Sequence, residues 1–327
     1  MSADPAAAMT EPAIVLDREI ARFSAAMLAG VPTAGDPALL PIAEQRRNAA
    51  LLRRGWTVGG PVMHRRVDHV AATSRGPVAI RIYHPSATRL LPALIYLHGG
   101  GWCFLDLDTH DRIMRELAAS TGWAVVGIDY PLAPEAPFPA AIEHCAAVME
   151  WLGAEGRALG LDAARLALAG DSAGANLALA LALKRRDEGR PPPAALILAY
   201  GVYDCDFARP SYRRFGAGNY PLSAERMKFL WSSYCPDPAA RRSPLASPLK
   251  GDLAGLPPTR LIIAEVDVLH DENIELAARL RAVGNATQAV VHLGTTHGFL
   301  EATTIAAVSR RAIAEAAGWL SDVAAAK

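Results

Sequence analysis

The fold is decided by one stretch of sequence, Leu166-Ala167-Leu168-Ala169-Gly170-Asp171-Ser172-Ala173-Gly174. Its apolar first part has the length of a buried strand, and the helix-prone segment Ala175–Lys184 follows it. Gly-x-Ser-x-Gly between a strand and a helix is typical of a tight turn that holds a serine in a strained backbone conformation and exposes its hydroxyl. A glycine-rich turn with an incidental serine is the alternative, so the motif needs support from elsewhere in the chain.

Outward from this stretch, short apolar segments alternate with longer amphipathic ones. The short segments are nearly continuous in apolar character, as parallel strands covered on both faces are: Val78–Tyr83, Ala93–Leu97, Ala124–Ile128, Leu166–Ala169, Ala195–Ala199, Arg260–Ala264 and Ala289–Leu293. The longer segments carry apolar residues three and four apart, as helices do: Ile113, Leu117 and Ala118, then Ile142, Ala146, Met149 and Leu152, then Ile274, Leu276, Ala277 and Leu280. This alternation predicts a mostly parallel, doubly wound α/β sheet.

Two regions depart from the alternation. Residues 1–55 look helical but precede the first strand. Residues 203–258 are rich in proline around one helical piece, Ala224–Tyr234: Pro210, Pro221, Pro236, Pro238, Pro244 and Pro248. We expect these regions to form a helical cap over the carboxyl edge of the sheet, where ligands bind in such folds. The core is then formed by residues 56–202 and 259–327.

Composition excludes several classes of protein. The 327 residues include 33 Lys and Arg against 33 Asp and Glu, which argues against a nucleic-acid partner and against a polybasic membrane anchor. The most apolar window, Leu166–Leu183, contains three polar side chains, and the segment Met1–Ile14 has no signal-peptide pattern. The 4 cysteines form no C-x-x-C pair, so we expect no disulfide framework, no cysteine-based zinc site and a reducing, cytoplasmic location.

A second motif strengthens the interpretation of Ser172. His98-Gly99-Gly100-Gly101-Trp102 follows the predicted strand Ala93–Leu97. Three successive glycines leave uncrowded backbone N–H groups, which can point at a developing oxyanion together with the N–H of Ala173. A phosphate-binding loop is the alternative, but the chain has neither a P-loop motif nor G-x-G-x-x-G.

A reactive serine needs a base, and three histidines follow Ser172 in the chain. His292 lies inside an apolar run and is expected to be a packed imidazole, while His270 lies among carboxylates just past a strand and is expected at the surface. His297 follows the last predicted strand in Gly294-Thr295-Thr296-His297-Gly298-Phe299, a loop from which it can reach the turn at Ser172. His297 is the predicted base.

The orienting acid is expected between the serine and the histidine in the chain. Four carboxylates, Glu265, Asp267, Asp271 and Glu272, surround the end of the predicted strand Arg260–Ala264. Asp271 and Glu272 begin the next helix, where carboxylates stabilise the N-terminus in any case. Asp267 is therefore the predicted acid.

Together these motifs resemble the hormone-sensitive-lipase-like family of α/β-hydrolases. The resemblance rests on five motifs in order: His98–Trp102, Asp129–Glu135, Gly170–Gly174, Asp267–Glu272 and His297–Phe299. Leu107–Arg115 and Tyr200–Tyr203 are most similar to segments of bacterial acetyl esterases. The resemblance implies an α/β-hydrolase fold and hydrolysis of short-chain carboxylic esters, without a metal or cofactor.

Residue by residue, the resemblance implies Ser172 as nucleophile, His297 as base and Asp267 as its orienter. It implies oxyanion donors at Gly100, Gly101 and Ala173. Residues expected to hold the surrounding loops are His98, Gly99, Asp129, Glu135 and Asp171.

Several points stay open at this stage. Trp102, Phe104 and Leu105 are candidates either for the wall of an acyl pocket or for ordinary core, as are Met227, Phe229, Leu230 and Trp231 in the cap. Cys103 is expected to be a small buried hydrophobe rather than a nucleophile. A lipase, an amidase or an acyltransferase would use the same residues, and a silent hydrolase-fold receptor would lack the base. The partner is expected to be a small ester, and the family includes both monomers and homodimers.

Overall fold

The computed structural model describes residues 14–31 and 39–326. Predictions for residues 1–13, including the absence of a signal peptide, lie outside this part of the chain. The strands are β1 (Arg65–Thr73), β2 (Gly76–His84), β3 (Leu91–Leu97), β4 (Ala124–Ile128), β5 (Leu161–Asp171), β6 (Leu196–Ala199), β7 (Thr259–Val266) and β8 (Thr287–Thr296). The helices are α1 (Arg18–Ala29), α2 (Ile42–Arg53), α3 (Asp111–Thr121), α4 (Ala140–Glu155), α5 (Ala173–Asp187), α6 (Pro210–Phe215), α7 (Ala224–Tyr234), α8 (His270–Ala282) and α9 (Ala307–Ala325).

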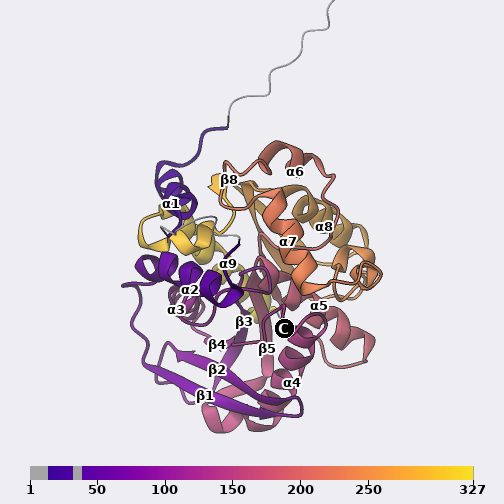
Figure 1. Ribbon diagram of the computed structural model, residues 1–327. Coiled ribbons are helices and arrows are strands. Elements are labelled where there is room, and N and C mark those ends of the chain that lie inside the picture. Colours follow the sequence, from indigo (N-terminus) through magenta and orange to yellow (C-terminus); the bar gives the residue numbers. More distant parts are fainter. Residues whose placement is uncertain (1–13, 32–38, 327) are drawn as a thin grey trace, which may run out of the picture.

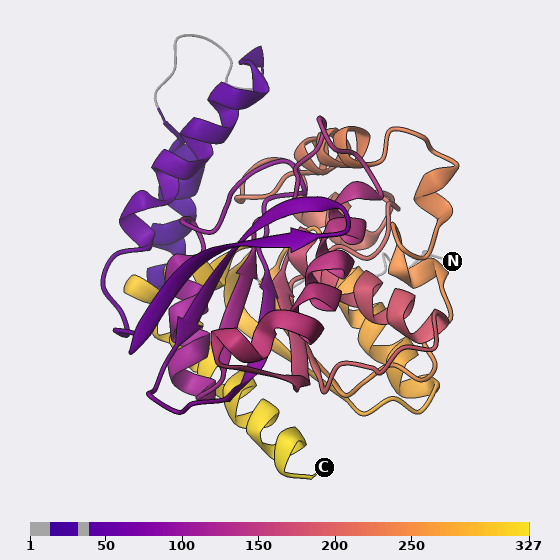
Figure 2. The same ribbon diagram turned by 90° about the horizontal axis from the view of Figure 1, so that it is seen from below.

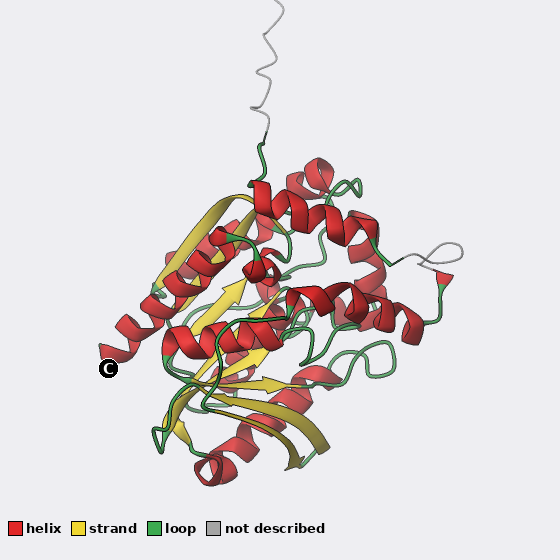
Figure 3. Cartoon of the chain, turned by 90° about the vertical axis from the view of Figure 1, so that its left-hand side faces the viewer, coloured by secondary structure: helices red, strands yellow, loops and turns green. Residues whose placement is uncertain are grey.

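All eight strands form one sheet, in the order β1-β2-β4-β3-β5-β6-β7-β8. Strand β2 runs antiparallel to both of its neighbours, and every pair from β4 to β8 is parallel. The twisted sheet lies between two helical layers (Figure 2 and Figure 3). The predicted α/β-hydrolase fold, with its mostly parallel sheet, is confirmed.

Two apolar clusters fill the space on either side of the sheet. On one face, α4, α5 and α8 pack against the strand residues that point to that face, such as Ile95 and Leu168. On the other face α3 and α9 pack against alternate residues such as Leu94 and Ala169. Both sets of side chains are buried because consecutive strand residues point to opposite faces. This explains why the central strands are nearly continuous apolar runs.

The structure differs from the sequence-based prediction at three elements. Strand β1 was not predicted, because it is an edge strand whose side chains are mostly exposed and polar. The short helix α6 was also missed, since it begins at Pro210 within a proline-rich segment. Ile274 was assigned to the buried stripe of α8, but its side chain is 41% exposed.

Figure 1 shows α1 and α2, near the beginning of the chain, at the same end of the sheet as α7 from the middle of the chain. The N-terminal region also touches the core loops directly, because Arg46 of α2 donates hydrogen bonds to the carbonyl oxygens of Cys103 and Ala133. This arrangement fits the predicted cap, although the boundaries at residues 55, 203 and 258 stay a prediction.

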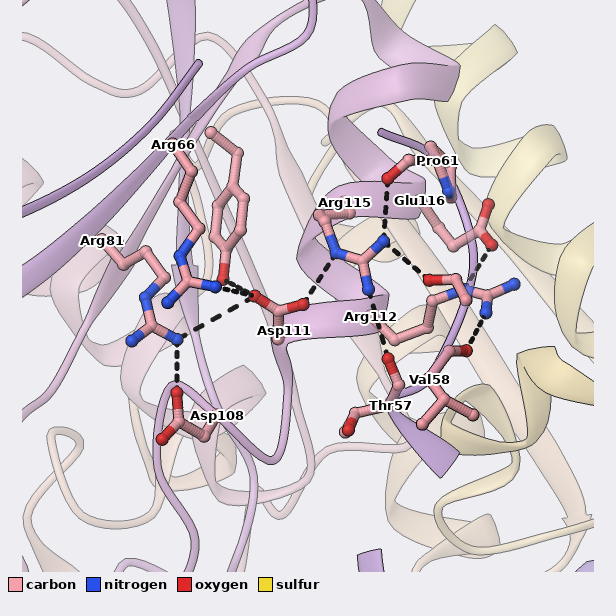
Figure 4. A network of polar contacts seen from close by, with 12 residues as sticks. Thr57, Val58, Pro61, Arg66, Arg81, Asp108, Asp111, Arg112, Arg115 and Glu116 are labelled. Carbon is pink, nitrogen blue, oxygen red and sulfur yellow. Dashed lines mark hydrogen bonds and ion pairs between the residues drawn. The ribbon is translucent and has the colours of Figure 1, made fainter. Parts of the chain in front are cut away.

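The segment that leads from α2 into β1 is held against α3 (Figure 4). Arg115 donates to the carbonyl oxygens of Pro61 at 2.8 Å and Thr57 at 3.2 Å. Its guanidinium is itself oriented by Asp111, one helical turn earlier, at 2.7 Å. Arg112 reaches the carbonyl oxygen of Val58 in the same way. These contacts attach the segment that follows α2 to the core.

Candidate active site

Ser172 lies at the turn between β5 and α5. Its backbone is left-handed, with φ 53° and ψ −120°, a conformation that costs on the order of 1–3 kcal/mol in a residue other than glycine. The two glycines of the motif are needed for steric reasons. A Cβ on Gly174 would overlap the carbonyl groups of Leu97 and His98, and one on Gly170 would overlap the backbone of Gly174. The close approach of strand and helix therefore requires glycine at both positions.

The structure brings Ser172, His297 and Asp267 together from three different loops. Asp267 directly follows β7 and His297 directly follows β8, so both lie at the same edge of the sheet as Ser172. His297 Nε2 lies 3.0 Å from Ser172 Oγ, and His297 Nδ1 lies 2.7 Å from Asp267 Oδ2. Since a carboxylate accepts only, the Nδ1–H of His297 donates to Asp267, and the hydroxyl of Ser172 can donate to Nε2.

The surroundings of the imidazole control its charge. Burial opposes protonation of His297, but the charge of Asp267 and its hydrogen bond outweigh burial and raise the pKa above its ordinary value of 6.5. Asp267 is almost fully buried, and its second oxygen accepts from the backbone N–H of Leu269 at 3.0 Å. The ring of Tyr200 packs edge-on against the imidazole, 5.0 Å away. The carboxylate is thus placed to stabilise an imidazolium.

The glycine loop after β3 lies beside Ser172. Gly100 and Gly101 have φ values of 113° and 60°, which glycine adopts without strain. Among the described residues, no acceptor pairs with the backbone N–H groups of Gly100, Gly101 or Ala173. The N–H of Gly99, in contrast, donates to Asp171 Oδ1 at 2.9 Å. Three donors near the serine are therefore available for an oxyanion, while Gly99 serves as an anchor.

Asp171 is the centre of the contacts that hold this loop. Besides Gly99, it accepts from the hydroxyl of Tyr96 at 2.7 Å, and His110 Nε2 lies 3.3 Å away. Burial acts to raise the pKa of Asp171, but the charge of His110 and the hydrogen bonds from His110 and Tyr96 together outweigh burial, so the pKa is lowered. Burial acts to lower the pKa of His110, and Asp171 raises it above the ordinary value. His110 was not assigned a role from sequence, although it lies within the segment Leu107–Arg115.

Two other predicted loop contacts are also present. His98 is buried, stacks on the ring of Tyr130 at 4.3 Å, and lies with Nδ1 2.8 Å from the carbonyl oxygen of Gly99. Burial lowers the pKa of His98 to about 4, so its ring is neutral near pH 7. Glu135 is exposed and accepts a two-pronged hydrogen bond from Arg46 of α2, at 2.6 and 2.9 Å.

Asp129 does not match its prediction. Its side chain is exposed, and among the described residues its carboxylate accepts no hydrogen bond. Its contribution to loop geometry comes from the backbone, because its N–H donates to the carbonyl oxygen of Ala79 at 3.0 Å. The Asp side chain is therefore not needed for this contact.

A cavity of about 200 Å³ opens in front of Ser172. Its walls come from the sheet edge and from the N-terminal and middle helices: Phe23, Met27, Ala49, Leu52, Arg53, Gly100, Gly101, Phe104, Leu105, Asp171, Ser172, Pro221, Leu222, Arg226, Leu230, His297, Gly298 and Glu301. Of the three residues considered either for a pocket wall or for core, Phe104 and Leu105 line the cavity. Trp102 does not, because it is buried beneath the loop and stacked 4.1 Å from the ring of Tyr234. No sequence motif indicates Arg53, Arg226 or Glu301 as cavity residues.

The remaining candidate residues lie elsewhere. His292 is buried against Phe299, as expected of a packed imidazole, and burial lowers its pKa. His270 is partly buried rather than at the surface, with Nδ1 2.8 Å from the carbonyl oxygen of Ala264. Glu272 does not cap its own helix but is buried and accepts from the backbone N–H groups of Tyr203 and Asp204.

Other predicted features can be compared with the described part of the chain. Within residues 14–31 and 39–326, no group of three or more His, Cys, Asp or Glu side chains is arranged to hold a metal ion. No helix in these ranges is long and apolar enough to cross a membrane. The four cysteines are free thiols, and burial raises the pKa of Cys103 to about 12, so it is neutral near pH 7.

A serine in a strand–turn–helix, joined to a histidine and an aspartate at the carboxyl edge of a mostly parallel sheet, defines an α/β hydrolase. The chain belongs to the α/β-hydrolase fold family, whose model matches residues 94–301. The resemblance found in the sequence is thereby confirmed.

Named relatives support the same family. The chain is 37% identical to an ethyl acetate hydrolase of Pseudomonas putida over 69% of this chain and 72% of that protein. It is also 37% identical to an acetyl esterase of Salmonella paratyphi B over 86% of this chain and 87% of the relative. Among solved structures, an ester hydrolase from the metagenome of Lake Arreo, in complex with a bipyridine phosphonate derivative, is similar with a TM-score of 0.87 and 34% identity, covering 94% of this chain and 99% of that one. An esterase of the archaeon Pyrobaculum calidifontis is similar with a TM-score of 0.83 and 33% identity, covering 87% of this chain and 94% of that one.

Proposed function

We propose that this protein is a serine carboxylesterase that hydrolyses short-chain, acetyl-type esters through an acyl-enzyme. The observation that carries the proposal is the continuous chain of contacts from Ser172 Oγ to His297 and from His297 to Asp267, which faces the cavity. Beside it lie three backbone N–H groups that no acceptor of the described residues occupies. A serine hydroxyl, a base and its orienting acid at these distances are the requirements for nucleophilic acyl transfer.

In the first half-reaction, Ser172 Oγ attacks the ester carbonyl carbon while His297 Nε2 takes the hydroxyl proton. The negative charge that develops on the carbonyl oxygen is stabilised by the N–H groups of Gly100, Gly101 and Ala173. Removal of one such donor typically costs about 2.7–4 kcal/mol of transition-state stabilisation. The tetrahedral intermediate then collapses, the bond to the leaving oxygen breaks, and His297 protonates the departing alcohol.

In the second half-reaction, water takes the place of the alcohol. His297 removes a proton from the water as its oxygen attacks the acyl-enzyme, and the proton returns to Ser172 Oγ when the carboxylic acid leaves. Asp267 keeps Nδ1 protonated throughout and stabilises the imidazolium formed in each half-reaction.

The preference for a small acyl group rests on two observations. The cavity of about 200 Å³ is small for a long acyl chain. The relatives that share 37% identity are named as hydrolases of acetyl esters.

The four free thiols support a reducing, cytoplasmic location. The proposed partner is a small ester, and a homodimer is a further proposal on family resemblance alone.

The replacement Ser172→Ala tests the mechanism. The variant should fold like the parent and lose hydrolysis of p-nitrophenyl acetate, and retained activity in a clean preparation would refute the proposal. A series of p-nitrophenyl esters from acetate to palmitate, with and without an added alcohol acceptor, tests the substrate class. Activity should fall with chain length and give free acid; a maximum at palmitate would indicate a lipase, and acyl transfer to the alcohol a transferase.

A further inference from the structure

The cavity in front of Ser172 is lined by two arginines, Arg53 and Arg226, and only Arg53 pairs with a carboxylate of the described residues. Arg53 of α2 is paired with Glu301, with its Nε 2.7 Å from Oε2 of the glutamate. The other acidic side chain of the cavity, Asp171, is occupied by Tyr96, Gly99 and His110. Arg226 of α7 therefore has no carboxylate partner among the described residues.

Arg226 is held in place by neutral groups. Its guanidinium lies over the ring of Phe104, 4.4 Å from the centroid, and over that of Phe229 at 5.0 Å. Its Nη1 donates one long hydrogen bond, 3.3 Å, to Gln45 Oε1. These contacts orient the group but leave Nε and Nη2 without an acceptor among the described residues. This edge of the guanidinium can bind a carboxylate through two parallel hydrogen bonds.

Arg226 lines the same cavity as the reacting groups Ser172 and His297. Leu230, one helical turn later on α7, packs so closely on Gly101 that a Cβ there would overlap it. Residues four apart on a helix lie on the same face, so Arg226 points into the same cavity about one turn, or roughly 6 Å, from the side chain that covers the glycine loop. The cavity is lined by both side chains together with Ser172 and His297.

A partly buried cation without a counter-charge is energetically unfavourable. Burial is the main cause that lowers the pKa of Arg226; Arg53 lowers it further, and Cys103 acts to raise it. No carboxylate of the described residues pairs with the charge of Arg226. A bound anion would compensate it. The cost in the free protein is then offset when a negatively charged ligand enters the cavity.

We propose that the cavity selects esters that carry a second, ionised carboxylate, and that Arg226 is the residue that recognises this group. This inference rests on the proposed esterase function, and it names the substrate class of the same site. The carboxylate can belong to the acyl part or to the alcohol part of the ester, since both parts enter the cavity in front of Ser172.

Two pairs of matched esters separate these sources. In the first pair, 3-acetoxybenzoate and phenyl acetate differ by a carboxylate on the alcohol part. In the second pair, monoethyl glutarate and ethyl pentanoate differ by a carboxylate in place of a terminal methyl on the acyl part. The quantity measured is the ratio of kcat/KM for the charged ester to that for its neutral partner, which cancels any general loss of activity.

For Arg226→Gln, this ratio should fall roughly ten- to hundredfold in at least one pair, as expected for loss of hydrogen bonds between charged groups. Arg226→Lys should keep part of the preference, because it retains the charge but not the two-pronged geometry. Arg226→Met, which preserves packing on Phe104, provides a second uncharged variant if the glutamine variant does not fold. The matched control is Lys228→Gln on the same helix, whose parent side chain is exposed and paired with Glu225, and it should leave both ratios unchanged.

Equal ratios in the parent and in Arg226→Gln for both pairs would overturn the inference. So would an equal decrease in Lys228→Gln, because the effect would then be one of surface charge. Binding of 3-acetoxybenzoate and monoethyl glutarate to Ser172→Ala, measured by calorimetry, keeps this test separate from the proposed function. If the parent hydrolyses no ester, the esterase proposal fails, while loss of carboxylate binding on adding Arg226→Gln to Ser172→Ala would still support recognition by Arg226.

Discussion

The two walls of the cavity are built in different ways. The wall at the sheet edge consists of strand ends, glycines and backbone N–H groups, held by buried contacts such as those of Asp171. The facing wall consists of helical side chains from α1, α2 and α7, among them Met27 and Arg226. The difference indicates that the first wall supplies the chemistry and tolerates little change, whereas the second determines which ester fits.

The largest effect is expected from a methyl group added at the sheet-edge wall. In Gly174→Ala, the new Cβ would overlap the carbonyl groups of Leu97 and His98, which cannot move without breaking the sheet. We expect a loss of more than about 4 kcal/mol of unfolding free energy and no esterase activity. Thermal unfolding followed by circular dichroism measures this loss.

The matched control is Gly318→Ala in the exposed interior of α9, where no atom lies within 4 Å of an added Cβ. This variant should be more stable than the parent by about 0.5–1 kcal/mol, because alanine favours a helix over glycine. Equal behaviour of the two variants would show that the close approach at Gly174 is not required.

A change of charge at the same wall is expected to rank second. Asp267→Asn removes the carboxylate that fixes the tautomer of His297, so kcat/KM for p-nitrophenyl acetate should fall about 10⁴-fold. In the parent, activity requires neutral His297 and should rise with pH through a pKa above 6.5. Without Asp267 this rise should move to lower pH, because the group that raises the pKa is gone.

Asp271→Asn is the control, because Asp271 begins α8 nearby and accepts from the backbone N–H of Ser211 instead. Its activity and pH profile should stay close to those of the parent. A larger loss in Asp271→Asn than in Asp267→Asn would show that the acid was assigned to the wrong residue.

A substitution in the helical wall should change selectivity rather than reactivity. Met27→Ala enlarges the cavity, so the ratio of kcat/KM for p-nitrophenyl octanoate to that for the acetate should rise by roughly tenfold. Steady-state kinetics with the two esters measures this ratio. If the ratio stays constant, the N-terminal helix does not limit acyl length.

The smallest effect is expected at Glu272 of α8, which does not line the cavity. Burial raises the pKa of this carboxyl well above its ordinary value, so its contribution to stability is complete below pH 4.5 and is lost as pH rises through the raised pKa. Glu272→Gln keeps an oxygen for the N–H groups of Tyr203 and Asp204 and removes the charge. The free energy of unfolding of Glu272→Gln, compared with that of the parent, should be higher at pH 9 than at pH 5 by on the order of 1 kcal/mol. Denaturant unfolding of both proteins at pH 5 and at pH 9 measures this change. If the carboxyl ionises freely, the difference between the variant and the parent will be the same at both pH values.

Much of the sheet-edge wall could be predicted from the sequence, because its requirements are local. A buried parallel strand needs a continuous apolar run, and a turn with overlapping backbones needs glycine, as at Gly170 and Gly174. Strand β1 was missed because an exposed edge strand has no such requirement. Asp129 was assigned a loop contact on resemblance, yet its backbone rather than its side chain makes the contact.

The helical wall could not be predicted in the same way. Arg53 and Glu301 lie 248 residues apart in the chain, and no local pattern indicates that they pair. Arg226 looks like any arginine on an amphipathic helix until Phe104, Gln45 and the cavity are brought around it by the fold. The role of His110 could not be predicted either, although the residue lies in the family segment Leu107–Arg115. Its contact with Asp171 depends on the packing of the loop after β3 against β5.

The central claim is that the hydroxyl of Ser172 is made reactive by His297 in the folded protein. Its most direct test is covalent labelling with diethyl p-nitrophenyl phosphate, followed by peptide mass spectrometry. We predict a single diethylphosphoryl group on Ser172 in the parent and no label in His297→Ala. Label on another residue, or equal labelling of Ser172 without His297, would contradict the account.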